Sequence, residues 1–338
     1  MDTSLNEVEE AVKDTYRRFF EKESTTAVVR ASEPSGFDRA LWNRLLELGT
    51  LSMALPGEVG GDDAGMVCVA LAAEQLGRQI APVPLIDAVA AARALARSGV
   101  PAARAAIEAM AAGDEIIVLA PRPTVDGVSR LVPHGAIADR IVVMDGDDLV
   151  LVPVVPDLSL ENLGSLPLAH CRTSGEPVVL ARGEDAAASF ARAVADVRVL
   201  TGAALVGIAD RSLELALEYV KVRKAFGIVI GSFQTVSHRL ADDVVDIDGA
   251  RLLVYEAAWS IDHGERAEER ASMSFLFGAQ VARRSSGDCL HFHGGVGFSM
   301  EHDSQLYYRR ARSWPLAYTR LDDEYRRLAD LLYGPQEG

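Results

Sequence analysis

The sequence has few of the residues that build disulfide, metal or membrane-spanning frameworks. Only three of its 338 residues are cysteines, Cys68, Cys171 and Cys289, and their spacing fits no zinc or disulfide framework. We expect buried or free thiols in a reducing compartment. No apolar run reaches the roughly 18 residues of a membrane-spanning helix, and the acidic start, with Asp2 and Glu7, differs from a signal peptide. The sequence therefore predicts a soluble, cytoplasmic protein without a membrane partner.

Positive charge is also scarce, because 34 Lys and Arg residues stand against 49 Asp and Glu residues, a net charge of −15. This negative field repels polyphosphates, and no long basic tract interrupts it, so we expect no nucleic-acid partner. An anionic ligand would need local cations, such as Arg223 between Lys221 and Lys224. Hydrophobic residues are abundant. They make up 49% of the sequence and charged residues 25%, a composition typical of a globular protein.

Hydrophobic periodicity divides the chain into three parts. Up to residue 112 apolar residues recur at helical spacing, as in Leu41, Leu45 and Leu48, and predict four to six helices. Short β-branched runs follow at residues 116–119, 141–143 and 149–155, bounded by Gly, Asp and Pro. The sequence predicts an α+β, mainly α fold, with an N-terminal helical domain (1–112), a shortened middle β domain (113–185) and a C-terminal helical bundle (186–338).

Two apolar stripes predict long antiparallel helices in the last part. The first stripe consists of Leu205, Ile208, Ser212, Ala216 and Val220, and the second of Leu240, Val244, Ile247, Val254 and Ala258.

The segment between these two helices contains residues suited to anion binding. Gly227 and Gly231 permit a tight connection, and Arg223 offers a fork of donors for a phosphate. Gln234 can donate or accept at the start of the next helix. The alternative interpretation is a plain helix hairpin with a solvated arginine.

A second segment, residues 291–298, has a cluster of glycines. Three glycines in four positions let a backbone approach a ligand closely, although a helix-terminating turn explains them equally well. His291 and His293 are two residues apart, but no third metal ligand stands at a known spacing, so we expect no metal site.

The two segments occur in this order in a chain that is predicted to be helical, then sheet, then helical again. In this combination they resemble the acyl-CoA dehydrogenase family. That family has an Arg, two residues, Phe-Gly and a later Phe-Gln, followed further on by Gln, two residues, Gly-Gly, one residue, Gly. The matching residues here are Arg223, Phe226, Gly227, Phe233 and Gln234, then Gly294, Gly295 and Gly297, with His291 in place of the Gln. The pairing of both motifs, about 60 residues apart, is more specific than either motif alone.

The resemblance implies the three-domain fold of this family, with a C-terminal four-helix bundle, in a tetramer or dimer of dimers. It also implies FAD at a subunit interface and an acyl-CoA substrate. Arg223 would pair with the FAD pyrophosphate, while Gln234 and the backbone of residues 291–295 would hold the adenosine side.

The sequence departs from the family where the catalytic glutamate would stand. One family location falls in residues 312–319, which contain no Glu, and the other falls at Val197, beside Arg198, which precedes Arg223 by 25 positions. The family segment that cradles the flavin ring is replaced by residues 119–124, around Arg122. Glu256 and Glu301 are the substitute carboxylates to examine, but a solvated or capping role is expected for both. No catalytic residue is assigned.

These losses resemble the short, base-free chain of actinobacterial acyl-CoA dehydrogenases that act on steroid side-chain thioesters. The preferred hypothesis is a non-catalytic subunit that completes the FAD site of a catalytic acyl-CoA dehydrogenase subunit, in an assembly of two plus two chains. One alternative is an independently active homo-oligomer with an unrecognised base. Another is a non-enzymatic scaffold or acyl-CoA-binding protein.

Overall fold

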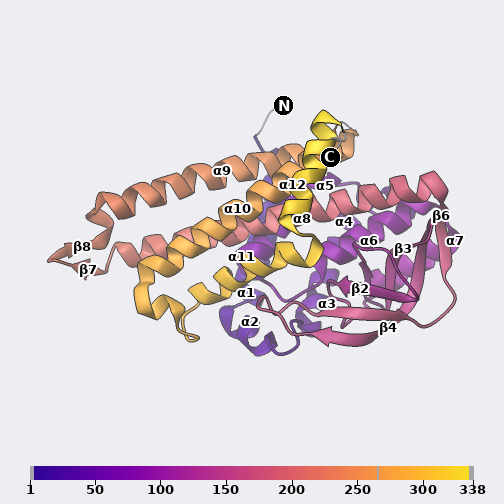
Figure 1. Cartoon of the computed structure of the whole chain (residues 1–338), viewed down its shortest axis with the longest axis horizontal. Coiled ribbons are helices and arrows are strands. Elements are labelled where there is room, and N and C mark those ends of the chain that lie inside the picture. The colour runs from indigo at the N-terminus through magenta and orange to yellow at the C-terminus, as the bar shows by residue number, and fades with distance from the viewer. Residues whose placement is uncertain (1–3, 265, 335–338) are drawn as a thin grey trace.

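Helices make up most of this protein and pack beside a small sheet, as the α+β, mainly α prediction requires (Figure 1). The computed structural model describes residues 4–264 and 266–334. In Figure 1 the first helices lie beside the sheet, and three long helices extend from there to the opposite end of the molecule. The predicted fold class is confirmed.

The described part of the first 112 residues contains seven α-helices, rather than the four to six expected. The difference arises from two short helices. Thr25 caps α2 by accepting a hydrogen bond from the Val28 N–H, and Gly49, with a φ of 79°, begins α4. The elements are α1 (Glu7–Glu23), α2 (Thr26–Ser32), α3 (Arg39–Glu47), α4 (Thr50–Met53), the 3₁₀ turn η1 (Gly57–Val59), α5 (Gly65–Arg78), α6 (Leu85–Ser98) and α7 (Pro101–Ala112).

A six-stranded sheet follows these helices, in the order β1-β3-β4-β5-β2, with β6 also paired to β4. β1 runs parallel to β3, and the other pairs are antiparallel. The long strand β4 pairs with β3 and β6 along its first half and with β5 along its second half. The strands are β1 (Ile117–Leu119), β2 (Val128–Val132), β3 (Arg140–Asp145), β4 (Asp148–Leu160), β5 (Leu168–Thr173) and β6 (Val178–Arg182).

The three apolar runs of the sequence correspond to β1, β3 and β4, which are buried over most of their predicted length. The strands β2, β5 and β6 were not predicted. Each alternates buried with partly exposed residues and includes an arginine, so none forms a continuous apolar run.

The remaining chain is helical apart from a small hairpin. Its elements are α8 (Gly183–Val220), β7 (Lys224–Ala225), β8 (Ile228–Val229), the 3₁₀ turn η2 (Ile230–Ser232), α9 (Gln234–His263), α10 (Ala267–His293), the 3₁₀ turn η3 (Gly294–Phe298), α11 (Ser304–Tyr318) and α12 (Leu321–Tyr333). All five residues of the α8 stripe are buried, as predicted. The α9 stripe is wrong at Val244, which is 43% exposed because it lies at the edge of the helix face that packs on the bundle.

The N-terminal helices and the bundle are joined by a close crossing of α5 and α8. A Cβ atom at Gly77 would lie 1.9 Å from the Ala204 carbonyl oxygen, and one at Gly207 would lie 2.0 Å from that of Glu74. Only glycine fits at either position. This crossing fixes α5 against α8, and both helices line the inner cavity described below.

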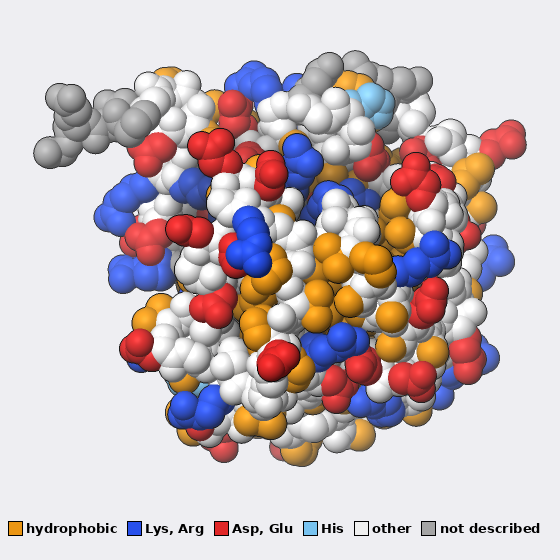
Figure 2. Space-filling view, turned by 90° about the vertical axis from the view of Figure 1, so that its right-hand side faces the viewer, with side chains coloured by type: hydrophobic (Ala, Val, Ile, Leu, Met, Phe, Trp, Pro, Cys, Tyr) orange, Lys and Arg blue, Asp and Glu red, His pale blue; other side chains and the backbone are white. Residues whose placement is uncertain are grey.

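No helix in the described ranges is both long and apolar enough to cross a membrane. On the face in Figure 2, acidic and basic side chains alternate around a small apolar area, so this face has no continuous basic patch. All three cysteines are buried and unpaired.

Candidate functional site

The first predicted motif forms a two-stranded hairpin that projects from the far end of the bundle (Figure 1). Phe226 and Gly227 occupy its turn, with φ angles of 53° and 85°, as a two-residue hairpin turn with two positive φ values requires. The Phe226 ring is 97% exposed and meets the Phe233 ring edge-on at 6.3 Å. Gln234 is the first residue of α9, as predicted.

Arg223 precedes this hairpin and is exposed. Its backbone is held on both sides, because its N–H donates to the Tyr219 carbonyl and its carbonyl accepts from the Ile230 N–H. Its guanidinium has no acidic partner in the described part of the chain. The cation is therefore free to bind an external anion.

The second motif forms the turn η3 at the end of α10. Gly294 has a φ of 62° and a ψ of −141°, a conformation that only glycine adopts readily. A Cβ atom at Gly294 or Gly295 would meet nothing within 4 Å, so open space adjoins this backbone. Gly297 differs, because a Cβ there would lie 2.5 Å from the Leu290 carbonyl oxygen. Gly294 and Gly295 thus leave room for a ligand, whereas Gly297 serves close packing.

The fold brings both motifs to the same end of the bundle. The Tyr219 ring on α8 lies 4.3 Å from the His293 ring on α10. Arg239 on α9 pairs with Asp288 on α10, and its guanidinium lies 5.5 Å from the Phe292 ring centre. We call residues 222–234 and 291–300 together the bundle tip.

The two histidines of the second motif have different surroundings. His291 is exposed, whereas His293 is buried and its Nδ1 lies 2.7 Å from the Cys289 carbonyl oxygen. The described residues contain no cluster of three His, Cys, Asp or Glu side chains able to hold a metal ion. His293 therefore has a structural role.

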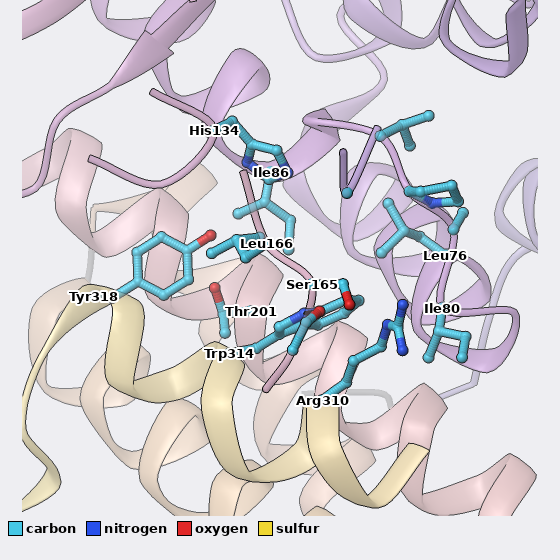
Figure 3. Close-up of a pocket in the computed structure, with 15 residues that line it drawn as sticks. Leu76, Ile80, Ile86, His134, Ser165, Leu166, Thr201, Arg310, Trp314 and Tyr318 are labelled. Carbon is cyan, nitrogen blue, oxygen red and sulfur yellow. Dashed lines mark hydrogen bonds between the residues drawn. The ribbon is translucent and has the colours of Figure 1, made fainter. Parts of the chain in front are cut away.

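A separate inner cavity lies between α5, α6, the sheet domain, α8 and α11 (Figure 3). Its free volume is only about 30 Å³, and Tyr318 and His134 both line it (Figure 3). Both side chains bond to Asp87, which is fully buried. The Tyr318 hydroxyl lies 3.2 Å and the His134 Nδ1 2.6 Å from the same oxygen, Asp87 Oδ2. We call Asp87, His134 and Tyr318 the inner triad.

Tyr318 stands within residues 312–319, where the family resemblance places a catalytic glutamate. Burial, followed by the nearby Asp87 carboxylate, raises the pKa of the Tyr318 phenol well above its ordinary value. The hydroxyl is therefore protonated at neutral pH and cannot act as a general base. Sequence reasoning missed Asp87 and His134. The available signal for Asp87 was an isolated acid in the apolar stretch that begins at Leu85.

An outer cleft of about 370 Å³ adjoins the opposite side of Tyr318, between the sheet domain and α8, α10 and α12. Arg122 crosses from the sheet domain to α11 beside this cleft. Its Nη1 donates to the Leu131 carbonyl at 3.0 Å and to the Ala317 carbonyl at 2.9 Å. Ala317 lies in the last turn of α11, where helix carbonyls lack internal donors. Arg122 thus ties the sheet domain to the end of α11, and burial lowers the pKa of its guanidinium.

The second family location for a base is occupied by Val197, which is buried, and the neighbouring Arg198 is largely buried. Arg198 Nη2 donates to Glu324 Oε2 at 2.8 Å, and the Ser272 hydroxyl donates to Glu324 Oε1 at 2.6 Å. Burial lowers the pKa of the Arg198 guanidinium, and the opposing effect of the Glu324 carboxylate offsets only part of this shift. Glu324 is buried and already accepts from these donors, so it is not a free base.

The two substitute carboxylates lie away from the inner cavity. Glu256 on α9 pairs with Arg270 at 3.2 Å. Glu301 is exposed near the bundle tip, where hydrogen bonds from its own backbone and from Ser299 lower its pKa. Neither glutamate lines the inner cavity.

Comparison with known proteins adds to this geometry. Family profiles described as acyl-CoA dehydrogenase, N-terminal domain, and acyl-CoA dehydrogenase, C-terminal domain, match residues 6–114 and 188–317. The acyl-CoA dehydrogenase FadE27 of Mycobacterium tuberculosis is 30% identical, over 86% of this chain and 87% of its own. The acyl-CoA dehydrogenase IpdE2 of Mycolicibacterium smegmatis is 29% identical, over 91% and 93%. A chain in the crystal structure of the ChsE4-ChsE5 complex from Mycobacterium tuberculosis is 27% identical, with a TM-score of 0.89 over 99% of this chain and 100% of that one.

Proposed function

This chain belongs to the acyl-CoA dehydrogenase family, and we propose that it is the flavin-contacting, base-free subunit of a heteromeric acyl-CoA dehydrogenase. The reaction is the α,β-desaturation of an acyl-CoA thioester, with a steroid side chain as the narrower substrate hypothesis. The observation that carries the proposal is Tyr318. A buried, protonated phenol stands where the family resemblance places the carboxylate that removes the α proton.

The inner cavity supports an inactive role for this chain alone. Pockets that bind small molecules usually enclose roughly 300–1,000 Å³, far more than the roughly 30 Å³ available here. The inner triad fills the remaining space with bonded side chains. An acyl chain would have to displace this network before it entered.

The bundle tip fits the phosphate and adenosine portion of FAD. Arg223 presents an unpaired guanidinium, which suits a pyrophosphate, and Gln234 stands at the start of α9. The open space beside Gly294 and Gly295 lets a ligand reach the backbone. When bound, FAD would supply the hydride acceptor of the reaction.

The position of the tip supports a site shared between chains. Figure 1 places the hairpin at the end of the bundle opposite the sheet domain, so it points away from this chain's own inner cavity. Phe226, Val296, Phe298 and Met300 expose apolar surface around it. Such a patch is typical of a protein contact. The flavin at this tip would therefore be held mainly by a neighbouring, catalytic chain, and the ChsE4-ChsE5 complex offers a precedent for a two-protein assembly.

The test is to purify the chain alone and together with a co-expressed catalytic acyl-CoA dehydrogenase, and to measure native mass, flavin absorbance and acyl-CoA oxidation. We expect a colourless or unstable lone chain and a yellow, active complex with one FAD per pair of chains. A yellow homo-oligomer that oxidises acyl-CoA by itself would contradict the proposal and favour an unrecognised base.

A further inference from the structure

The turn η3 is connected to α11 by a short link, residues 299–303, that is tied to the N-terminal helix α2. Arg30 on α2 makes all the bonds of this tie. Its Nη1 donates to the Met300 carbonyl at 2.6 Å, and its Nη2 donates to the Glu301 carbonyl at 3.0 Å and to Asp303 Oδ1 at 2.8 Å. These partners are about 270 residues away in the sequence, so the tie joins the first and last parts of the fold.

The side chains of the link itself anchor it only in part. Met300 is 62% exposed, whereas the His302 ring lies 4.4 Å from the His293 ring and its Nδ1 lies 2.8 Å from the Ser304 hydroxyl. The preceding glycines add backbone freedom. Two hydrogen bonds from α11 also hold this region: the Ser304 hydroxyl donates to the Gly297 carbonyl at 3.0 Å, and Gln305 Nε2 donates to the Met300 carbonyl at 3.4 Å. Arg30 therefore fixes the side of the link that faces α2.

The helix that carries Arg30 is itself held against α11. Glu33, next to the end of α2, accepts from Arg309 at 2.7 Å and from Arg310 at 3.0 Å. All three of these side chains are largely buried. These ion pairs hold the backbone of α2, and with it Arg30, against α11, because α2 cannot shift relative to α11 without breaking them.

We propose that Arg30 is a positioning residue for the flavin contact. It holds residues 299–303 so that the backbone at Gly294 and Gly295 keeps the conformation in which its open face meets FAD. The inference rests on the proposed function of the bundle tip. It assigns a role in cofactor affinity to α2 of the N-terminal helical domain.

Arginine suits this role because its planar fork presents several donors in fixed directions, whereas a lysine ammonium holds one or two acceptors on a flexible stem. Arg30→Ala removes all three bonds, Arg30→Lys keeps part of them, and Asp303→Asn weakens one. Arg18→Ala is the matched control, because Arg18 is an exposed arginine of the same N-terminal domain, 3.9 Å from Asp14.

The experiment uses the co-expressed complex, stripped of flavin and titrated with FAD. We expect the FAD dissociation constant to rise about tenfold for Arg30→Ala and about threefold for Arg30→Lys and Asp303→Asn, with no change for Arg18→Ala. Amide hydrogen exchange should accelerate in residues 294–303 of Arg30→Ala. The melting temperature of the flavin-free complex should stay near that of the unaltered protein.

Arg223→Ala distinguishes a failure of this inference from a failure of the proposed function. If Arg223→Ala weakens FAD binding and Arg30→Ala does not, Arg30 has no positioning role and the proposed function stands. If neither substitution changes FAD affinity, the tip does not contact flavin and both ideas fail. If Arg30→Ala lowers the flavin-free melting temperature and Arg30→Lys is no better, Arg30 serves stability alone and the inference is wrong.

Discussion

The bundle tip and the inner cavity are two regions of one chain that have opposite properties. At the tip, Arg223 is exposed and no acidic side chain among the described residues pairs with it, and the glycine backbone adjoins open space. In the inner cavity, every member of the triad is bonded to another, and little free volume remains. A ligand could reach the first region with no rearrangement, whereas it could enter the second only by breaking buried hydrogen bonds.

Under the proposed function, contact with a cofactor and chemistry on a substrate are separable within this fold. The two regions differ in exposure as their proposed roles require, although Asp87 Oδ1 and Thr201 Oγ1 at the inner cavity are buried without a hydrogen-bond partner in the described part of the chain. A contact surface needs unsatisfied donors that a partner completes, and a region without a catalytic role is more stable when its polar groups satisfy one another. Substitutions in the two regions should therefore affect different measurements.

The largest expected effect is on stability, from Asp87→Ala in the inner triad. The change leaves the Tyr318 hydroxyl and the His134 Nδ1 buried without their acceptor, which should cost about 3 kcal/mol of unfolding free energy. Denaturant unfolding of the co-expressed complex measures it. Because the triad lies away from the bundle tip, the FAD content of the folded fraction should not change.

Asp87→Asn is the matched control for this experiment. The amide keeps an acceptor oxygen and nearly the same volume, so its cost should be smaller than that of the alanine variant. Equal stability of the alanine variant and the unaltered protein would show that the triad does not hold the inner cavity closed. A loss of FAD from the folded Asp87→Ala complex would show that the two regions are coupled.

The next effect is on cofactor affinity, from Arg223→Ala at the tip. A charge-assisted hydrogen bond to a phosphate contributes about 1.5–3 kcal/mol, so the FAD dissociation constant should rise about 10- to 100-fold. Flavin fluorescence titration of the stripped complex measures the change, and native mass should show that assembly is intact. Arg192→Ala, an exposed arginine of α8, should leave FAD affinity unchanged.

The sequence indicated the turns of the tip but not the inner triad, for a physical reason. Each tip motif is local: Arg223, two glycines and Gln234 stand within residues 223–234, and three glycines stand within residues 294–297, so each segment predicts its own turn. The inner triad is not local, because Asp87 lies 47 residues from His134 and 231 from Tyr318. Taken alone, each is an ordinary residue, and only the packing of α6, the sheet domain and α11 brings them together.

The same distinction between local and tertiary information applies to the fold. The stripe on α8 was predicted correctly because α8 packs on both α5 and α10, so period and burial agree. On α9 the same period included Val244, which is exposed, because α9 forms an outer layer with one open side (Figure 1). The periodicity of a sequence predicts which side of a helix is buried. How many residues that side includes depends on the neighbouring elements, which the periodicity does not predict.

The smallest expected effect is that of Tyr318→Phe, which separates stability from catalysis within residues 312–319, where the family resemblance places a base. The substitution removes one hydrogen bond, from the Tyr318 hydroxyl to Asp87, and should cost about 1 kcal/mol of unfolding free energy. Acyl-CoA oxidation by the complex should stay within about twofold of the unaltered rate, far less than the roughly hundredfold loss expected for a general acid or base. Tyr308→Phe, on the same helix α11, controls for the loss of a phenol hydroxyl elsewhere. A large fall in turnover with unchanged FAD content would mean that Tyr318 takes part in the chemistry, and that the inner cavity of this chain is an active site.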